Sequence, residues 1–326
     1  MPTKILSASD IRTLITMDEA IDVIAKAFEE LSRGSYVMPL RTVNDIGPGK
    51  IASFYKPCWL PSQHTLSVKL LSQLKTDHPK HIPTIRGLVI LTDTETNSVK
   101  AVIDGATLTA IRTGAASGAA TRVLAREDSG VLALFGAGTQ GYTQFEAVCS
   151  VREIREAYIF DIDHASTERL ANHFREKFNC NITVADDLSV LSRADIICTA
   201  TPAGKPLFTT DSLKPGVHIN AVGSYNPLMQ ELPEDLFSKA LLYVDHEESC
   251  FSESGDIINP IRSGMLNMGN YRGEIGSLLA CQTIGRNTPG DITLFKSVGI
   301  AVQDHAIAEY AYAKAVELNT GTDIEF

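Results

Sequence analysis

The 326-residue sequence lacks the patterns that mark several protein classes. Its six cysteines show no CxxC spacing and its eight histidines form no HExxH or HxxEH motif, so we predict reduced cysteines and no metal site. No apolar run approaches the ~18 residues of a membrane helix, and acidic residues interrupt the N-terminus where a signal peptide needs an apolar core. We therefore expect a cytoplasmic protein with no membrane partner.

A basic patch is also missing. The net charge is −10, and the lysines and arginines are scattered along the chain, so nucleic acid is not an expected partner. Hydrophobic residues make up 44% of the sequence and charged residues 21%, which is ordinary globular composition. The length exceeds what one hydrophobic core usually serves, so two domains are predicted.

The hydrophobic pattern changes along the chain. A capping box at Thr16 and Glu19 begins an amphipathic helix that Gly34 ends. Short β-like runs follow over 51–55, 66–71 and 84–91. From Ser129 onward, apolar β runs alternate with helical stretches, which is typical of a doubly wound parallel sheet of Rossmann type. The predicted class is α/β, with a mixed α+β domain preceding the Rossmann domain.

A complete GxGxxG motif lies in the segment VLALFGAGTQGYTQ, between a strand and a helix. Gly136 permits the tight turn, Gly138 lets the backbone approach a pyrophosphate, and Gly141 allows close helix packing. Asp161 ends the next strand, where a carboxylate binds ribose hydroxyls and repels a 2′-phosphate. We predict a dinucleotide site that favours NAD(H) over NADP(H). The alternative is a structural glycine turn with Asp161 as a solvated turn residue.

Three basic residues stand among apolar or small neighbours in the first domain: Arg41, Lys69 and Arg112. A basic side chain in such surroundings is partly desolvated, which is costly unless an anion pairs with it. Arginine with lysine makes a sound receptor for a carboxylate. Any one of these residues alone is more simply explained as an ordinary surface or ion-paired side chain.

The chain resembles the ornithine cyclodeaminase/mu-crystallin family over nearly its whole length. The resemblance is carried by MPLRTV, SVKLL, the long segment from PTIRGLVILTD to TGAASGAAT, the glycine loop, CTATPAGKPLF, HINAVGS and ITLFKSVGIAVQDHA. It implies a homodimer, with a substrate and dimerisation domain over 1–123 and 302–326 and a Rossmann domain over 124–301. It also implies that Arg41, Lys69 and Arg112 bind the substrate carboxylate with Thr84 nearby, and that Lys69 and Arg112 are catalytic. The residues implied to line the cofactor are Thr113, Thr139, Gln140, Asp161, Thr201, Val222 and Ser297.

One motif departs from the cyclodeaminase pattern. The family's GGDxPGKxE is GSYNPLMQE in this chain, so Tyr225 replaces the aspartate and Met229 the lysine. Ornithine cyclisation would lack its acidic partner, and the resemblance instead favours the Δ1-pyrroline-2-carboxylate and ketimine reductase branch. In the expected mechanism the basic residues hold a cyclic α-imino acid for hydride transfer, and Lys69, its pKa lowered by the arginines, relays a proton. Alternatives are alanine dehydrogenase activity, cyclodeaminase activity, or small-ligand binding without catalysis.

Overall fold

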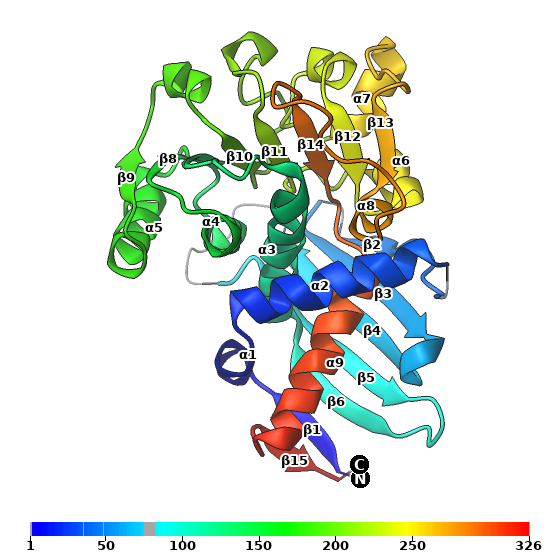
Figure 1. The fold of residues 1–326 in the computed structure, drawn as a ribbon. Coiled ribbons are helices and arrows are strands. Elements are labelled where there is room, and N and C mark those ends of the chain that lie inside the picture. Colours follow the sequence, from blue (N-terminus) through cyan, green and yellow to red (C-terminus); the bar gives the residue numbers. More distant parts are fainter. Residues whose placement is uncertain (1, 35, 48, 75–81, 326) are drawn as a thin grey trace. The chain divides into compact units, whose positions relative to one another are not determined.

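The computed structural model describes residues 2–34, 36–47, 49–74 and 82–325. Two compact units form, residues 1–112 with 300–326 and residues 113–299 (Figure 1). The sequence places the change of domain at residues 123 and 302, whereas the units divide at 112 and 300. The difference arises because α3 (Gly105–Leu124) is one continuous helix whose residues belong to both units.

The first unit is built on a seven-stranded sheet in the order β15-β1-β6-β5-β4-β3-β2. Its strands are antiparallel except for the β1–β6 pair, and their bounds are β1 (Thr3–Leu6), β2 (Thr42–Ile46), β3 (Ile51–Leu60), β4 (Thr65–Leu74), β5 (Ile85–Asp93), β6 (Val99–Asp104) and β15 (Thr322–Ile324). Helix α9 (Ala301–Glu317) packs on β3 to β6, and α2 (Met17–Ser32) crosses α9 (Figure 1). The short α1 (Ala8–Leu14) and the 3-10 turn η1 (Pro61–Gln63) complete the unit.

Local sequence explains the elements that support this unit. Thr16 and Glu19 form the predicted capping box at the start of α2, and Ile21, Ile24 and Phe28 are buried along its apolar face. In β4 the side chains alternate between buried and less buried positions from Thr65 to Leu71, because successive residues point to opposite faces of a strand. One face of the sheet is therefore covered by α9, and no described helix of this unit packs on the other.

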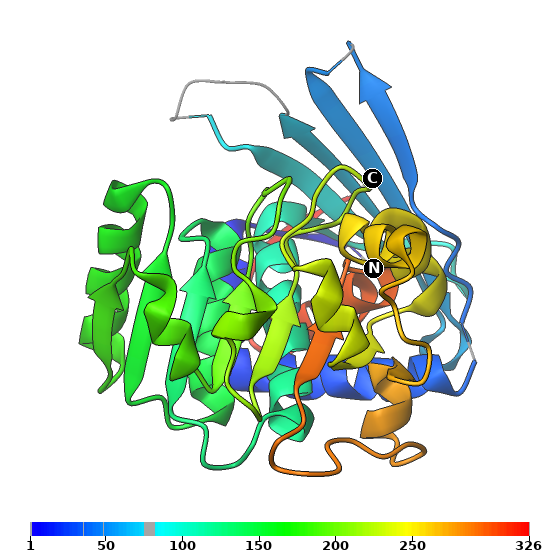
Figure 2. The ribbon, with the colours of Figure 1, turned by 90° about the horizontal axis from the view of Figure 1, so that it is seen from above.

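The second unit is a parallel eight-stranded sheet in the order β13-β12-β14-β11-β10-β7-β8-β9. Figure 2 shows its strands following one another across the unit. Their bounds are β7 (Val131–Phe135), β8 (Glu156–Phe160), β9 (Asn181–Val184), β10 (Ile196–Thr199), β11 (His218–Ala221), β12 (Leu241–Val244), β13 (Tyr271–Glu274) and β14 (Thr293–Lys296). Strand order reverses between β7 and β10, which makes the carboxyl edge there a topological switch point. The predicted doubly wound sheet is confirmed.

Helices and turns connect these strands and surround an apolar core of leucine, isoleucine, valine, alanine and phenylalanine side chains. The helices are α4 (Thr139–Val151), α5 (His164–Lys177), α6 (Glu247–Glu253), α7 (Gly255–Ser263) and α8 (Ile275–Leu279), and the 3-10 turns are η2 (Leu188–Ser192), η3 (Thr210–Ser212) and η4 (Glu234–Ser238). The first strand and the helix of this βαβ unit lie where the sequence pattern places them. Strand β7 spans Val131–Phe135, and α4 begins at Thr139.

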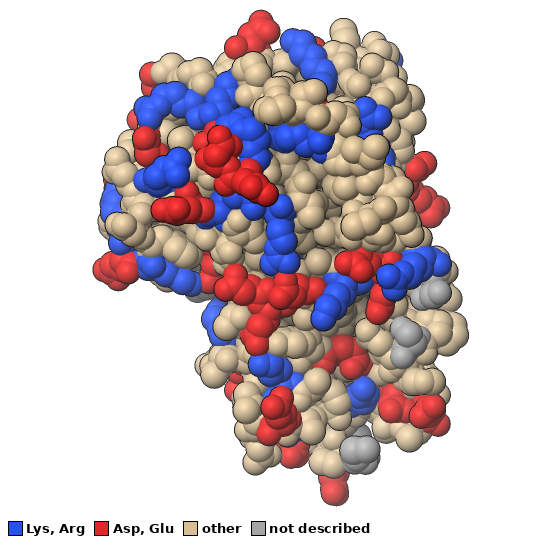
Figure 3. All heavy atoms as spheres, in the orientation of Figure 1, with Lys and Arg blue, Asp and Glu red and all other residues tan. Residues whose placement is uncertain are grey.

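Charge and hydropathy agree with this architecture. Acidic and basic side chains are interspersed over the face drawn in Figure 3. No helix in the described part of the chain is long and apolar enough to span a bilayer. The six cysteines form no disulfide, and burial raises the pKa of Cys198 to about 12, so that thiol stays protonated.

Candidate functional site

Two strand lysines share the helix-covered face of the first sheet. Lys56 of β3 lies directly opposite Lys69 of β4 in the antiparallel pairing, and the two residues are only 5% and 1% exposed. Directly opposite residues project to the same face. Lys69 was predicted and Lys56 was missed, because the sequence prediction ended this strand at Tyr55. The alternation of Ala52, Lys56 and Cys58 on the buried side is the signal that could have found it.

Asp304 of α9 joins Lys69 to Arg112 of α3. Its Oδ2 atom lies 2.6 Å from Lys69 Nζ, and its Oδ1 atom accepts a hydrogen bond of 3.0 Å from Arg112 Nε. Arg112 Nη1 also donates to Gln303 Oε1 at 3.0 Å. Lys69 Nζ donates to Thr109 Oγ1 at 3.3 Å. Two of the three predicted basic residues are thus brought together around a buried carboxylate that sequence reasoning missed.

Arg41 precedes β2 on the same side of the sheet. Its guanidinium carbon lies 5.7 Å from the centroid of the Phe54 ring, a cation–π contact. Its charge also acts on both Lys56 and Lys69, so all three predicted basic residues belong to one cluster. We call Arg41, Lys56, Lys69, Arg112 and Asp304 the cation cluster.

Thr84 is not brought into the cation cluster by the sheet. It is exposed and precedes β5, and its carbonyl accepts a hydrogen bond from the backbone amide of Leu74. The β5 residue opposite Lys69 is Val89. Thr84 lies five residues before Val89 in the chain, which corresponds to roughly 16 Å at the usual rise of a β-strand.

Electrostatics in the cation cluster follow from burial and from like charges. The pKa of Lys69 is lowered to about 7: burial is the main cause, Asp304 opposes it, and the charges of Arg112 and Arg41 add to the lowering. The predicted direction is therefore found, but burial rather than the arginines is its main cause. Burial and the charges of Lys69 and Arg41 also lower the pKa of Lys56. Burial disfavours the charged form of Asp304, yet Lys69 and Arg112 hold its pKa below the usual range.

The glycine loop of the second unit has the geometry of a phosphate cradle. Gly136 has φ +100°, and a Cβ there would lie 2.6 Å from the Ala200 carbonyl oxygen. Gly141 sits so close to Gly136 that a Cβ would lie 2.0 Å from the carbonyl oxygen of Gly136. A Cβ at Gly138 would meet nothing within 4 Å, so the backbone there is open to a ligand. These roles match the dinucleotide motif better than a purely structural turn.

Residues around the loop also fit a dinucleotide. Asp161 follows β8, and its carboxylate accepts hydrogen bonds from the amides of Ala137 at 2.7 Å and Asp163 at 2.9 Å. It is thus fixed beside the loop with lone pairs remaining for hydroxyl donors. Thr139 begins α4, and the adjacent Gln140 has a buried Oε1 atom that accepts no hydrogen bond from the described residues.

The small-residue segment of α3 packs against α4. The Thr113 carbonyl accepts a hydrogen bond of 3.2 Å from Gln144 Nε2. A Cβ on Gly114 would lie 2.5 Å from the Thr143 carbonyl oxygen, so only glycine allows this approach. This close approach holds Thr113 next to α4.

Three further predicted cofactor residues follow neighbouring strands. Thr201, Val222 and Ser297 come after β10, β11 and β14, which are adjacent in the sheet. Carboxyl ends of parallel strands meet at one edge, so these residues share an edge with the glycine loop after β7. Ser297 is fixed by Asp245, whose Oδ2 accepts hydrogen bonds from Ser297 Oγ at 2.7 Å and from the Gly299 amide at 2.8 Å.

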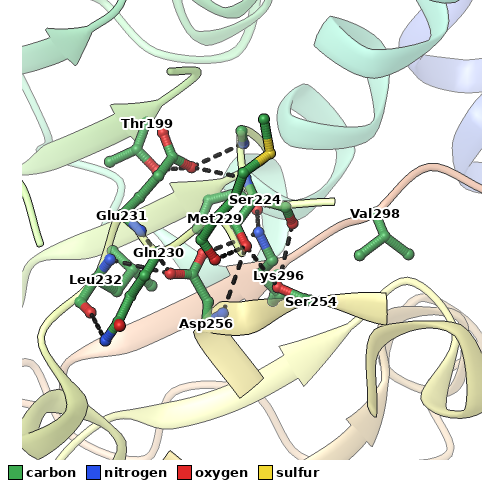
Figure 4. Close-up of polar contacts among 12 residues, drawn as sticks. Thr199, Ser224, Met229, Gln230, Glu231, Leu232, Ser254, Asp256, Lys296 and Val298 are labelled. Carbon is green, nitrogen blue, oxygen red and sulfur yellow. Dashed lines mark hydrogen bonds and ion pairs between the residues drawn. The ribbon is translucent and has the colours of Figure 1, made fainter. Parts of the chain in front are cut away.

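Glu231 is fully buried and accepts hydrogen bonds from residues at the same edge of the sheet (Figure 4). One carboxylate oxygen accepts from the amide and hydroxyl of Thr201 at 2.7 and 2.8 Å. The other accepts from Thr199 Oγ1 at 2.9 Å and from the amides of Gly223 at 2.8 Å and Ser224 at 3.2 Å. Burial and the nearby Asp256 raise the pKa of Glu231, while five donors aimed at its oxygens favour the charged form.

A buried ion pair supports this carboxylate. Asp256 Oδ1 accepts from the amides of Glu231 at 2.7 Å and Leu232 at 3.0 Å, and its Oδ2 atom lies 3.1 Å from Lys296 Nζ (Figure 4). Glu231 is the last residue of GSYNPLMQE, so the final position of that motif holds the loop in place. Tyr225, in the same loop, packs against the apolar core of this unit.

Comparison with known proteins finds similarity over the whole chain. The model of the ornithine cyclodeaminase/mu-crystallin family matches residues 1–319. A Δ1-pyrroline-2-carboxylate reductase of Bacillus cereus is 36% identical over 324 residues, 99% of each chain. The structure of the Thermococcus litoralis Δ1-pyrroline-2-carboxylate reductase in complex with NADH and L-proline is 36% identical with a TM-score of 0.94, covering 99% of this chain and 100% of that one. An archaeal alanine dehydrogenase dimer with bound NAD is 32% identical with a TM-score of 0.92, covering all of both chains.

Proposed function

Because this chain belongs to the ornithine cyclodeaminase/mu-crystallin family, we propose that it uses NADH to reduce a cyclic α-imino acid such as Δ1-pyrroline-2-carboxylate to the amino acid, proline in that case. It is an oxidoreductase that acts on carbon–nitrogen bonds. The observation that carries the proposal is the cation cluster, because a buried set of arginine and lysine side chains is suited to a substrate carboxylate.

The cofactor is NAD(H), the molecule bound in the solved relatives. When bound, the nicotinamide supplies the hydride. The backbone at Gly138 would approach the pyrophosphate, while Gly136 forms the tight turn and Gly141 lets the helix pack closely. The Asp161 carboxylate would accept hydrogen bonds from the ribose hydroxyls. A 2′-phosphate beside Asp161 would be repelled, so NADPH serves less well. The remaining cofactor contacts come from Thr113, Thr139, Gln140, Thr201, Val222 and Ser297.

The substrate's carboxylate is held by Arg112, Lys69 and Arg41. The Arg112 guanidinium is already oriented by Asp304 and Gln303, so little side-chain freedom is lost when it binds an anion. Reduction adds a hydride to the imine carbon and a proton to the nitrogen. Lys69, with a pKa of about 7, holds a proton that it can release near neutral pH and is the proposed donor.

Alanine dehydrogenase activity is the second candidate, since the archaeal relative carries that name and a similar carboxylate receptor would serve the imine of pyruvate. Cyclodeamination of ornithine is disfavoured. It needs a negative charge near the terminal amine, and Tyr225 offers a phenol, which is a neutral hydrogen-bonding group, where the cyclodeaminases have a carboxylate. We also propose that the protein is a homodimer, as the archaeal relative is described.

One assay separates these activities. NADH oxidation is measured with Δ1-pyrroline-2-carboxylate, with Δ1-piperideine-2-carboxylate, and with pyruvate plus ammonia, and ammonia release is measured with ornithine and NAD. We expect turnover of a cyclic imine and no useful conversion of ornithine. Ammonia release from ornithine without NADH oxidation on either cyclic imine would overturn the proposal. Tight NADH binding with no turnover of any substrate would indicate a binding protein instead.

A further inference from the structure

Asp304 lies between the two cations that the reaction is proposed to use. It belongs to the first turn of α9, where the positive end of the helix dipole favours a carboxylate. Its Oδ2 atom lies 2.6 Å from Lys69 Nζ, and its Oδ1 atom accepts from Arg112 Nε at 3.0 Å. Asp304 and Lys69 are each only 1% exposed, so water screens their interaction little. One side chain thus links the proposed proton donor to the proposed carboxylate receptor.

The acceptors around Lys69 Nζ favour its ammonium form. The Thr109 hydroxyl donates to the Gly105 carbonyl at 2.6 Å, so its oxygen accepts from Lys69 Nζ, 3.3 Å away. The Asp304 carboxylate is a second acceptor. An ammonium group has three N–H bonds, and these are the two acceptors that the described residues offer it. The third N–H bond can therefore be directed to a substrate nitrogen.

We propose that Asp304 is the positioning residue for proton delivery: it keeps the Lys69 ammonium group charged and fixed relative to Arg112. This inference rests on the proposed reductase function. In the reduction, the imine carbon receives a hydride from NADH and the imine nitrogen receives a proton from Lys69 Nζ. Lys69 regains a proton from water before the next turnover. Asp304 itself transfers no proton and acts only through its two partners.

Electrostatics in the cation cluster support this role. Burial is the main cause of the lowered pKa of Lys69, and the charge of Asp304 is the largest influence that opposes it. The charged and titratable groups around this pair on the neighbouring elements are Arg41, Lys56, Cys58, Arg112 and His305. The arginines lower the pKa of Lys69 further. The thiol and the imidazole are neutral near pH 7, because burial raises the pKa of the thiol to about 12 and lowers that of the imidazole to about 4.

The test measures kcat/KM against pH for the cyclic imine that the wild type reduces best. This parameter reports groups of the free enzyme and the free substrate, and the substrate is the same for every variant. Reduction needs protonated Lys69, so activity is present at low pH and is lost as the pH rises through the pKa of about 7. Asp304→Asn removes the charge that keeps this proton on Lys69. We expect its basic limb to move to lower pH by about one unit or more, which lowers kcat/KM about tenfold on the basic side.

Two variants separate this role from a purely structural one. Asp304→Glu keeps the negative charge, so its basic limb should stay close to that of the wild type, although the longer side chain displaces Arg112 and raises KM. Asp195→Asn is the matched control. Asp195 is a buried carboxylate of the second unit that also joins an arginine to a lysine, Arg126 at 2.7 Å and Lys214 at 2.5 Å. Its loss should lower Tm without moving the basic limb.

Gln303→Glu keeps the test decisive if Asp304→Asn does not fold. Gln303 precedes Asp304 in α9, and its Oε1 atom accepts from Arg112 Nη1 at 3.0 Å. The variant retains this acceptor and adds a negative charge to the cation cluster. Its basic limb should therefore move to higher pH, the opposite direction to that expected for Asp304→Asn. An unmoved limb in Gln303→Glu would then overturn the inference.

The outcomes distinguish this inference from the proposed function. A folded Asp304→Asn with the basic limb of the wild type overturns the positioning role and leaves the reductase proposal intact, because Asp304 would then only stabilise the fold. The same holds if Asp304→Glu shifts the limb as far as Asp304→Asn does. Absence of NADH oxidation by the wild type with every imine overturns the proposed function, and the inference falls with it.

Discussion

Asp304 determines how basic residues can be buried in the first unit. Sequence reasoning found Arg41, Lys69 and Arg112, because each stands among apolar or small neighbours where an unpaired charge is costly. It did not find Asp304, which lies 192 residues after Arg112 and reaches it only through the return of α9 to the sheet. Buried cations do predict that a carboxylate exists, but the pattern alone does not say which of 39 acidic residues supplies it.

Arg112→Met provides a test of the carboxylate receptor at this scale. We expect KM for the imino acid to rise about 30–100-fold, since a charged hydrogen bond contributes about 2–3 kcal/mol. NADH affinity, measured by fluorescence titration, should stay within about twofold of wild type. Arg122→Met is the control, because Arg122 is exposed on the same helix. A parallel loss of NADH and substrate affinity in Arg112→Met would contradict a role confined to the carboxylate.

At the scale of elements, strong local patterns were predictable and weak ones were not. Strand β7 and the start of α4 were predicted to the residue, because an apolar run, a glycine loop and a helix follow one another there. Strand β3 was cut short at Tyr55, since Lys56 and Pro57 weaken a strand pattern that tertiary pairing with β4 restores. The three-residue β15 has no buried side chain and depends on pairing with β1, so no periodicity marks it.

The loop at 223–231 is also an element whose geometry depends on long-range contacts. Its sequence showed a departure from the cyclodeaminases at Tyr225 and Met229, but not that Glu231 fastens the ends of β10 and β11. That role needs the fold, because the donors come from Thr199, Thr201 and the loop's own amides. All of these groups donate hydrogen bonds to the Glu231 carboxylate. Replacing one of its oxygens by a donor would therefore remove hydrogen bonds.

Glu231→Gln should therefore loosen this element. In the variant an NH2 group replaces one carboxylate oxygen, and this NH2 group would face hydrogen-bond donors from which it cannot accept. Lys296 would also lose a nearby negative charge. We expect the free energy of unfolding to fall by about 2–4 kcal/mol in urea titrations, and NADH affinity to fall with it. Glu248→Gln on the exposed side of α6 is the control and should change stability by less than about 0.5 kcal/mol. Wild-type stability in Glu231→Gln would show that the five donors do not require a carboxylate.

For the whole molecule, the face of the first sheet opposite α9 supports the proposed homodimer. Tyr55 lies opposite Leu70, and Leu70 opposite Leu88, so these side chains form a row on the face away from Lys56 and Lys69. They are 37%, 38% and 44% exposed, and Trp59 of the same strand as Tyr55 is 38% exposed. Large apolar side chains exposed together on one face of a sheet are typical of an interaction surface. A second copy of the chain offers an identical apolar face, which a twofold axis can place against the first.

Leu70→Lys with Leu88→Lys tests that arrangement. Two ammonium groups on each copy would meet in the centre of an apolar interface, where an unpaired charge is costly, so we expect the dissociation constant of the dimer to rise about 100-fold or more. Sedimentation equilibrium and the concentration dependence of Tm measure this directly, because association stabilises the folded state by mass action. Ile162→Lys is the matched control, since Ile162 is fully exposed in the second unit and lies outside this row. The double variant should become a folded monomer at concentrations where the wild type and Ile162→Lys remain dimeric. A wild-type dissociation constant in the double variant would place the dimer contact on another surface, and a monomeric wild type would remove the homodimer altogether.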